Sequence, residues 1–140
     1  MRKQGDKART ILALALMIFG GVACNLLRPT AMETPAATPA IPQVKILFPA
    51  HNQQVIEGVV FDIEIHASDQ AVGIQRVELY VDEVLQQTSA SESGSVRDYR
   101  VTMNWYAKEL GWHKFAVIAY RADGGASHPH IIALEVIAPA

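Results

Sequence analysis

The sequence contains a single cysteine, Cys24, among its 140 residues. One cysteine cannot form a disulfide within the chain, so the disulfide frameworks that stabilise many small exported domains are excluded. An exported protein rarely keeps a free reactive thiol. A chemical role other than an internal disulfide is therefore expected for Cys24, and the residues before it indicate which one.

Long apolar runs are also lacking. A transmembrane helix needs roughly 20 apolar residues, whereas the run from 11 to 23 has 13 residues and would be about 20 Å long as a helix. A retained membrane-spanning helix is therefore disfavoured. Small residues end the run and four cations precede it, which is the order of an export signal; the cations are Arg2, Lys3, Lys7 and Arg9.

The export signal ends in the tetrapeptide Gly21-Val22-Ala23-Cys24. This tetrapeptide resembles the bacterial lipobox, in which small residues precede a cysteine that becomes a lipid-carrying N-terminus. The resemblance implies a lipoprotein signal peptide over 1–23, cleavage between Ala23 and Cys24, and lipidation of Cys24. The protein would then be anchored at the cell membrane or outer surface, with its domain outside the cytoplasm. Ordinary cleavage with an incidental cysteine is the alternative.

The chain has no excess of positive charge. It carries 12 Lys and Arg against 14 Asp and Glu, and residues 1–23 hold four of the cations and one of the acids. The remaining 117 residues therefore have 8 cations and 13 acids, a net charge of −5. This charge argues against nucleic acid as a partner, because phosphate binding requires a basic face. Membrane attachment would depend on acyl chains on Cys24.

A proline-rich segment follows the cysteine. Residues 24–42 read CNLLRPTAMETPAATPAIP, with four prolines spaced by alanine and threonine. Such a composition cannot bury enough apolar surface to fold, and proline favours an extended backbone. The sequence therefore predicts a disordered linker over 24–42, which separates the lipid anchor from one folded domain over 43–138.

The domain lacks helical periodicity, and its hydrophobic pattern has a period of two. In 59–67, for example, Ile63 and Ile65 share one face of a strand, while Glu64 lies on the other. The predicted strands are 44–48, 59–67, 74–81, 84–88, 97–105, 113–121 and 131–137, with 84–88 at a sheet edge. About seven strands separated by turns predict an all-β fold, an immunoglobulin-like antiparallel β-sandwich.

Several turns and strand ends resemble those of bacterial Ig-like domains found in surface and secreted proteins. The segments that carry the resemblance are Ala67-Ser68-Asp69, VELYVD at 77–82, Gly111-Trp112-His113 and AYRADG at 119–124. The resemblance implies the sandwich fold over 43–138 and specifies no ligand. Family members commonly have Asp-Gly where this chain has Asp82-Glu83. Because glutamate resists positive φ, a tight type I′ hairpin is not expected at this turn.

Catalytic motifs are absent from the sequence. It has no GxSxG nucleophile elbow, no HExxH zinc motif and no phosphate-binding glycine loop. The chain is therefore not expected to be an enzyme, a small hydrolase being the least favoured interpretation, and no cofactor is expected.

Two groups of residues have the right chemistry for metal binding without the spacing of a metal site. His128 and His130 would share one face of an extended segment, but no acidic or cysteine ligand lies nearby in the sequence. Asp69, Asp82 and Asp123 fall at strand ends with no contiguous calcium-binding loop. No metal site is predicted from either group.

Three aromatic residues, Trp112, Tyr80 and Tyr120, are expected to face outward and are the candidate binding residues. Two functions remain open. The first is a lipid-anchored module for protein interaction or adhesion at the cell envelope, with an envelope or extracellular protein as its partner. The second is a carbohydrate-binding module that stacks glycans on these aromatic rings. A third interpretation is that these rings only pack against neighbouring side chains of the domain, in which case they bind neither kind of partner.

Overall fold

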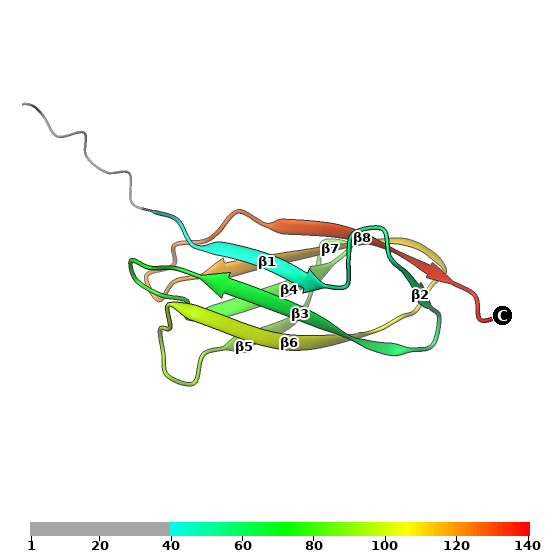
Figure 1. The fold of residues 1–140 in the computed structure, drawn as a ribbon, viewed down its shortest axis with the longest axis horizontal. Helices are drawn as coiled ribbons and strands as arrows, with labels where there is room; N and C mark the ends of the chain where they lie inside the picture. Colours follow the sequence, from blue (N-terminus) through cyan, green and yellow to red (C-terminus); the bar gives the residue numbers. More distant parts are fainter. Residues whose placement is uncertain (1–39) are drawn as a thin grey trace, which may run out of the picture. The chain divides into compact units, whose positions relative to one another are not determined.

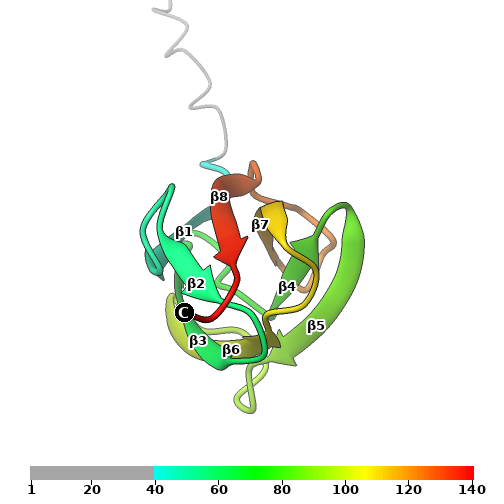
Figure 2. The same ribbon diagram turned by 90° about the vertical axis from the view of Figure 1, so that its right-hand side faces the viewer.

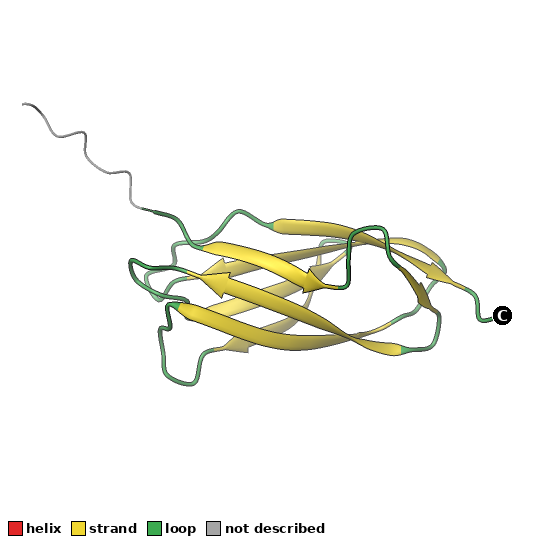
Figure 3. Cartoon of the chain, in the orientation of Figure 1, coloured by secondary structure: helices red, strands yellow, loops and turns green. Residues whose placement is uncertain are grey.

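The computed structural model describes residues 40–140. In this part of the chain the regular secondary structure consists of β-strands, which are joined by loops and turns (Figures 1 and 3). The strands are β1 (Gln43–Phe48), β2 (Gln54–Ile56), β3 (Val60–Ser68), β4 (Arg76–Val81), β5 (Val84–Ala90), β6 (Asp98–Tyr106), β7 (Gly111–Tyr120) and β8 (His130–Ile137). Within these residues no helix is long and apolar enough to cross a membrane. The predicted signal peptide, Cys24 and the linker as far as Pro39 lie outside the described residues.

The strands form two sheets that pack face to face. The three-stranded sheet has the order β1-β3-β6, and the five-stranded sheet has the order β2-β8-β7-β4-β5. Figure 2 looks at the sandwich from the end where the C-terminus lies and shows the two layers. Every strand pair is antiparallel except β2 with β8, which is parallel. The structure confirms the predicted all-β, immunoglobulin-like sandwich.

The core lies between the sheets and consists of the inward side chains that the alternation predicts. Ile63, Leu79 and Phe115 are fully buried, because each stands on the inner face of its strand. Aromatic rings fill the end near the start of β7, where Trp105 and Phe115 meet edge to face with their ring centroids 5.1 Å apart. Burial of these apolar surfaces supplies the main stabilising free energy of the domain.

Two features of the strands differ from the prediction. The short β2 is an eighth strand, and it pairs Val55 with Val136 of β8. Three residues are too few to show a period, so its sequence carries no strand signal. In β1 the register shifts between Ile46 and Phe48. This irregularity turns the Phe48 side chain outward, where it is exposed.

The β4–β5 turn corrects the expectation that Asp82-Glu83 would not form a tight hairpin. Only these two residues separate the strands, and both have positive φ, 50° for Asp82 and 71° for Glu83, as a type I′ turn requires. Contacts with β7 hold the turn. The Lys114 amide donates to Asp82 Oδ1 over 2.9 Å, and Lys114 Nζ donates to Glu83 Oε1 over 2.7 Å.

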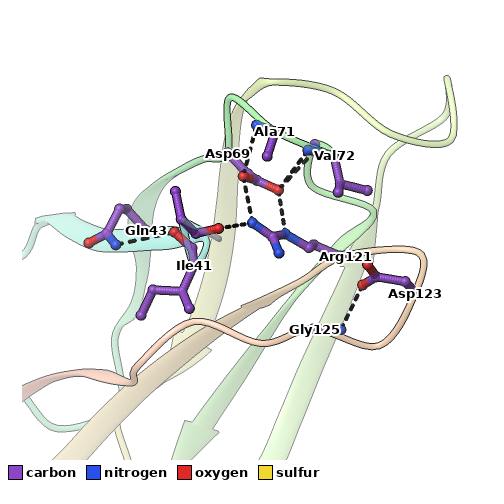
Figure 4. A network of polar contacts seen from close by, with 10 residues as sticks. Ile41, Gln43, Asp69, Ala71, Val72, Arg121, Asp123 and Gly125 are labelled. Carbon is purple, nitrogen blue, oxygen red and sulfur yellow. Dashed lines mark hydrogen bonds and ion pairs between the residues drawn. The ribbon is translucent and has the colours of Figure 1, made fainter. Parts of the chain in front are cut away.

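The domain's contacts begin upstream of Gln43. Pro42 is buried, and the Arg121 guanidinium donates from Nη2 to the Ala40 carbonyl. Figure 4 shows Arg121 between this segment and Asp69. In Figure 1 the C-terminus lies at the opposite end of the sandwich from the start of β1. The two ends of the domain are thus separated by the length of its strands.

Candidate functional site

An apolar group of residues lies on the outer face of the five-stranded sheet, across β2, β8 and β7. Ile56 is the register partner of Ile137, and Gly111 is the partner of Val136. Leu110 directly precedes Gly111 and therefore lies at the level of Ile137. Trp112 follows on the same face, opposite Glu135. We call Ile56, Leu110, Trp112 and Ile137 the Trp112 patch.

Ile56, Trp112 and Ile137 point outward because their neighbours in each strand point into the core, and Leu110 directly precedes β7. Val136 and His113 are buried, and Val55 packs against the core. By alternation, the residues beside them face solvent. Trp112 is 58% exposed, Leu110 59% and Ile56 48%. The sheet therefore presents a large indole flanked by aliphatic side chains to the outside.

Polar pairs border the Trp112 patch. Gln54 Nε2 donates to Glu135 Oε2 over 2.7 Å, which joins the exposed faces of β2 and β8. On the side toward β4, Lys114 and Glu83 form a surface ion pair with a nitrogen–oxygen distance of 2.7 Å. Apolar side chains next to hydrogen-bonded polar groups are usual in protein–protein interfaces.

Tyr80 and Tyr120 lie on the same outer face, gathered around Glu78. The Tyr80 hydroxyl donates to Glu78 Oε2 over 2.6 Å, and Arg76 Nε donates to Glu78 Oε1 over 2.8 Å. The Arg76 guanidinium carbon lies 4.0 Å from the centroid of the Tyr120 ring. Both tyrosines are thus engaged with charged neighbours.

These contacts set the ionisation of the cluster. The hydrogen bond to the Glu78 carboxylate, together with burial, raises the pKa of Tyr80 to about 12. Burial alone would raise the pKa of Glu78, but hydrogen bonds from Tyr80 and Arg76 outweigh it and lower the pKa. The cluster therefore keeps a neutral tyrosine beside a charged carboxylate at neutral pH.

The structure brings Tyr80 and Tyr120 together and leaves Trp112 apart from them. Trp112 and Tyr120 are eight residues apart in β7, which is about 27 Å along a strand. Tyr80 pairs with Ala116, midway between them. By register Trp112 lies opposite Glu135, and the aliphatic Ile137 and Leu110 lie two positions further along the sheet. Sequence reasoning missed Ile56 and Ile137 as site residues, because their position depends on the parallel pairing of β2 with β8.

A buried histidine supports the segment that carries the patch. His113 Nδ1 lies 2.6 Å from Asp82 Oδ2, and its Nε2 lies 2.8 Å from the Glu109 carbonyl oxygen. Both partners are acceptors, so both ring nitrogens donate at once only when the imidazole is doubly protonated. The Trp105 ring centroid is 5.3 Å from that of His113. His113 thereby ties the backbone before Leu110 to the β4–β5 turn.

The pKa of His113 is shifted by opposing effects. Burial lowers it, but the Glu109 carbonyl and the Asp82 carboxylate favour the protonated ring, and the net result is a raised pKa. For Asp82, burial raises the pKa, but hydrogen bonds from the Lys114 amide and from His113 lower it by more. The net result is a lowered pKa. The pair is consequently an ion pair when the histidine is protonated.

Four of the five residues weighed for metal binding, all except His128, have hydrogen-bond partners within the domain. Asp69 pairs with Arg121 beyond the end of β7, whereas Asp82 contacts His113 near its start, so the two lie at opposite ends of that strand. Asp123 accepts from the Gly125 amide over 2.9 Å. His130 Nδ1 accepts from the Ile46 amide over 3.2 Å. Between residues 40 and 140, no three His, Cys, Asp or Glu side chains are grouped so as to hold a metal ion.

The chain is similar to known proteins in sequence and in fold. The family model described as "Bacterial Ig domain" matches residues 42–117. No curated protein matches the chain. Among solved structures, the fibronectin(III)-like modules of CbhA from Clostridium thermocellum are 28% identical with a TM-score of 0.58, over 70% of this chain and 47% of theirs.

Two further structures share the fold at low identity. An SrpA adhesin from Streptococcus sanguinis is 14% identical with a TM-score of 0.52, over 70% of this chain and 58% of that one. A CARDB domain from Pyrococcus furiosus is 13% identical with a TM-score of 0.50, over 71% of this chain and 93% of that one. The chain thus spans about half the length of the CbhA and SrpA chains.

Proposed function

The chain belongs to the bacterial Ig domain family, and from this membership we propose that it is a lipid-anchored module that binds an envelope or extracellular protein through the Trp112 patch. The family and the fibronectin(III)-like likeness point to non-catalytic domains. The observation that carries the proposal is the exposed indole of Trp112 in the same patch as the exposed side chains of Leu110 and Ile56. The anchor would be the lipid on Cys24, with the domain outside the cytoplasm.

The composition of the Trp112 patch supports a protein partner. Tryptophan is strongly enriched among the few interface residues that carry most of the binding free energy, and such residues lie centrally within a ring that excludes water. Here Leu110 and Ile137 lie two positions along the sheet from the indole, Glu135 of the Gln54–Glu135 pair lies opposite it, and the Lys114–Glu83 pair lies on the side toward β4. Exposed apolar groups rimmed by polar residues are typical of interaction sites on soluble domains.

The position of the Trp112 patch supports presentation away from an anchor. The patch includes Ile137, the last residue of β8, and the segment from Ala40 to the start of β1 lies at the other end of the sandwich (Figure 1). The chain leads from Ala40 back toward Cys24. A partner bound at the patch would therefore contact the end of the domain that is farther from the tether.

The experiment is a binding measurement with matched variants. The full chain is used to capture a partner from envelope extract, and the purified partner is then titrated against the wild type, Trp112→Ala and Val60→Ala. Val60 is 58% exposed on the other sheet and serves as the control. We expect Trp112→Ala to weaken binding roughly 30-fold, as loss of a hot-spot residue does. Unchanged affinity in Trp112→Ala, or an equal loss in Val60→Ala, would contradict the proposal.

A further inference from the structure

The edge strands of the two sheets, β5 and β6, face each other along one side of the sandwich. They belong to different sheets, so no backbone ladder joins them. At one end of this seam the Ser89 and Tyr99 hydroxyls are hydrogen-bonded over 2.8 Å. At the other end the seam opens into a depression of about 340 Å³ lined by Gln86, Gln87, Asn104, Trp105, Tyr106 and Lys108. We call this the seam depression.

The lining of the seam depression offers polar groups that the domain itself does not use. Within residues 40–140, the side chains of Gln87, Asn104, Tyr106 and Lys108 form no hydrogen bond or ion pair with other residues. Gln86 makes one long contact, 3.4 Å from its Nε2 to the Val84 carbonyl. These groups are hydrated in the free protein. A ligand that replaces their water molecules with hydrogen bonds of equal quality leaves no polar group of the lining unpaired.

The types of residue in the lining select the chemistry of that ligand. A carboxamide holds a donor and an acceptor side by side, which matches neighbouring hydroxyls that both donate and accept. The Tyr106 side chain, 54% exposed, adds an aromatic face and a hydroxyl. With no acidic side chain and a single cation, the lining suits neither a metal ion nor a polyphosphate. We propose that the seam depression binds a saccharide.

In this site Gln87 and Asn104 bond ring hydroxyls from β5 and β6, and the Tyr106 ring contacts a sugar face. The volume is at the lower end of the range for small-molecule sites, about 300–1,000 Å³, so a short saccharide occupies it. The open side leaves room for a longer glycan to continue along the seam. The site is separate from the Trp112 patch and does not depend on the function proposed for that patch.

Saturation-transfer difference NMR on the full chain tests this proposal. The probes are glucose, galactose, N-acetylglucosamine and glucuronic acid, each also as a short oligomer. We expect at least one to give a saturable signal, and Asn104→Ala and Gln87→Ala to weaken its binding about fivefold each, one hydrogen bond being lost in each variant. Gln43→Ala is the matched control, because β1 is the opposite edge of the three-stranded sheet from β6.

The remaining outcomes overturn the proposal. No signal from any probe at about 10 mM excludes a saccharide site of useful affinity. A saccharide whose binding is lost in Trp112→Ala but kept in Asn104→Ala binds at the other face. An extended peptide that perturbs β6 resonances while no sugar does so would assign the seam to strand addition. Each variant is first checked for an unchanged unfolding midpoint. Apart from a saccharide whose binding depends on Trp112, these results do not bear on protein binding at the Trp112 patch.

Discussion

Asp69 and Arg121 form a buried ion pair at the end of the sandwich where the described chain begins. Arg121 Nε donates to Asp69 Oδ2 over 2.6 Å and Nη2 donates to Oδ1 over 3.0 Å (Figure 4). Asp69 also accepts from the amides of three residues in the following loop, Ala71, Val72 and Gly73. The guanidinium, with these amides, holds the pKa of Asp69 far below its ordinary value despite burial.

We expect Asp69→Asn to lower the free energy of unfolding by about 3–5 kcal/mol, because the Arg121 charge would stay buried without its counter-charge. Asp98→Asn is the control. Asp98 pairs with His66 over 2.8 Å but is 63% exposed, and such surface pairs contribute at most about 1 kcal/mol. Urea unfolding at pH 6 measures both. Equal losses in the two variants would show that the buried Asp69 pair contributes no more to the free energy of unfolding than an exposed pair does.

His113 makes the stability of the domain depend on pH. Its pKa is raised above the ordinary 6.5 in the folded state, so the folded chain holds this proton more tightly than the unfolded chain. The corresponding stability is fully present below the unfolded pKa and is lost as pH rises through the folded pKa. We expect the urea midpoint to fall as pH rises above the ordinary pKa of 6.5 and through the higher pKa of the folded state.

His113→Gln separates this effect from other titrations. Glutamine has no proton to lose in this range, so its midpoint should be lower than that of the wild type at pH 6 and should change less with pH. A variant whose midpoint falls with pH as steeply as the wild type would show that another group is responsible. Trp105 fluorescence in a Trp112→Phe background reports the same titration locally, since the His113 ring lies 5.3 Å from that indole.

At the scale of the element, the register of β3 can be tested by two adjacent substitutions. Ile63 is fully buried, and Glu64 is exposed on the other face of the strand. Ile63→Ala should lower the free energy of unfolding by roughly 2–5 kcal/mol, since it leaves a cavity in the core. Glu64→Ala should change it by less than about 0.5 kcal/mol. Thermal unfolding measures both, and similar midpoints would mean that the two faces are exchanged.

The strands were predictable from the sequence because one face of each sheet is buried. In β3, β4, β6, β7 and β8 an apolar side chain at every second position reports directly on the core. The tight turn at Asp82-Glu83 was not predictable from the sequence, because Lys114 from another strand maintains its positive φ angles. Tertiary contacts of this kind override local preference.

The candidate site was predictable only in part, for the same reason. Trp112 was expected to face outward, and the alternation of β7 places it there. Its neighbours Ile56 and Ile137 come from strands that meet by parallel pairing, which no local pattern indicates. The ion pair of Asp69 with Arg121 spans 52 positions of the sequence and likewise has no signal in either segment.

At the scale of the whole molecule, the proposal requires that the domain be attached through Cys24. We expect the mature chain to begin at Cys24 and to partition into detergent, and Cys24→Ser to accumulate as an uncleaved or mislocalised precursor. Lasting attachment needs two or more acyl chains, because one gives only marginal binding. Intact-mass analysis of membrane-extracted protein measures the modification. A free thiol on Cys24 in that fraction would contradict lipid anchoring.

The central claim is that the domain meets its partner through the Trp112 patch while attached to the cell. Site-specific photo-crosslinking in intact cells tests it most directly, with a photoreactive amino acid introduced at position 112 or, as the control on the other sheet, at position 60. The account predicts a discrete adduct with an envelope or extracellular protein from position 112 and none from position 60. Adducts from both positions alike, or from position 60 alone, would contradict it.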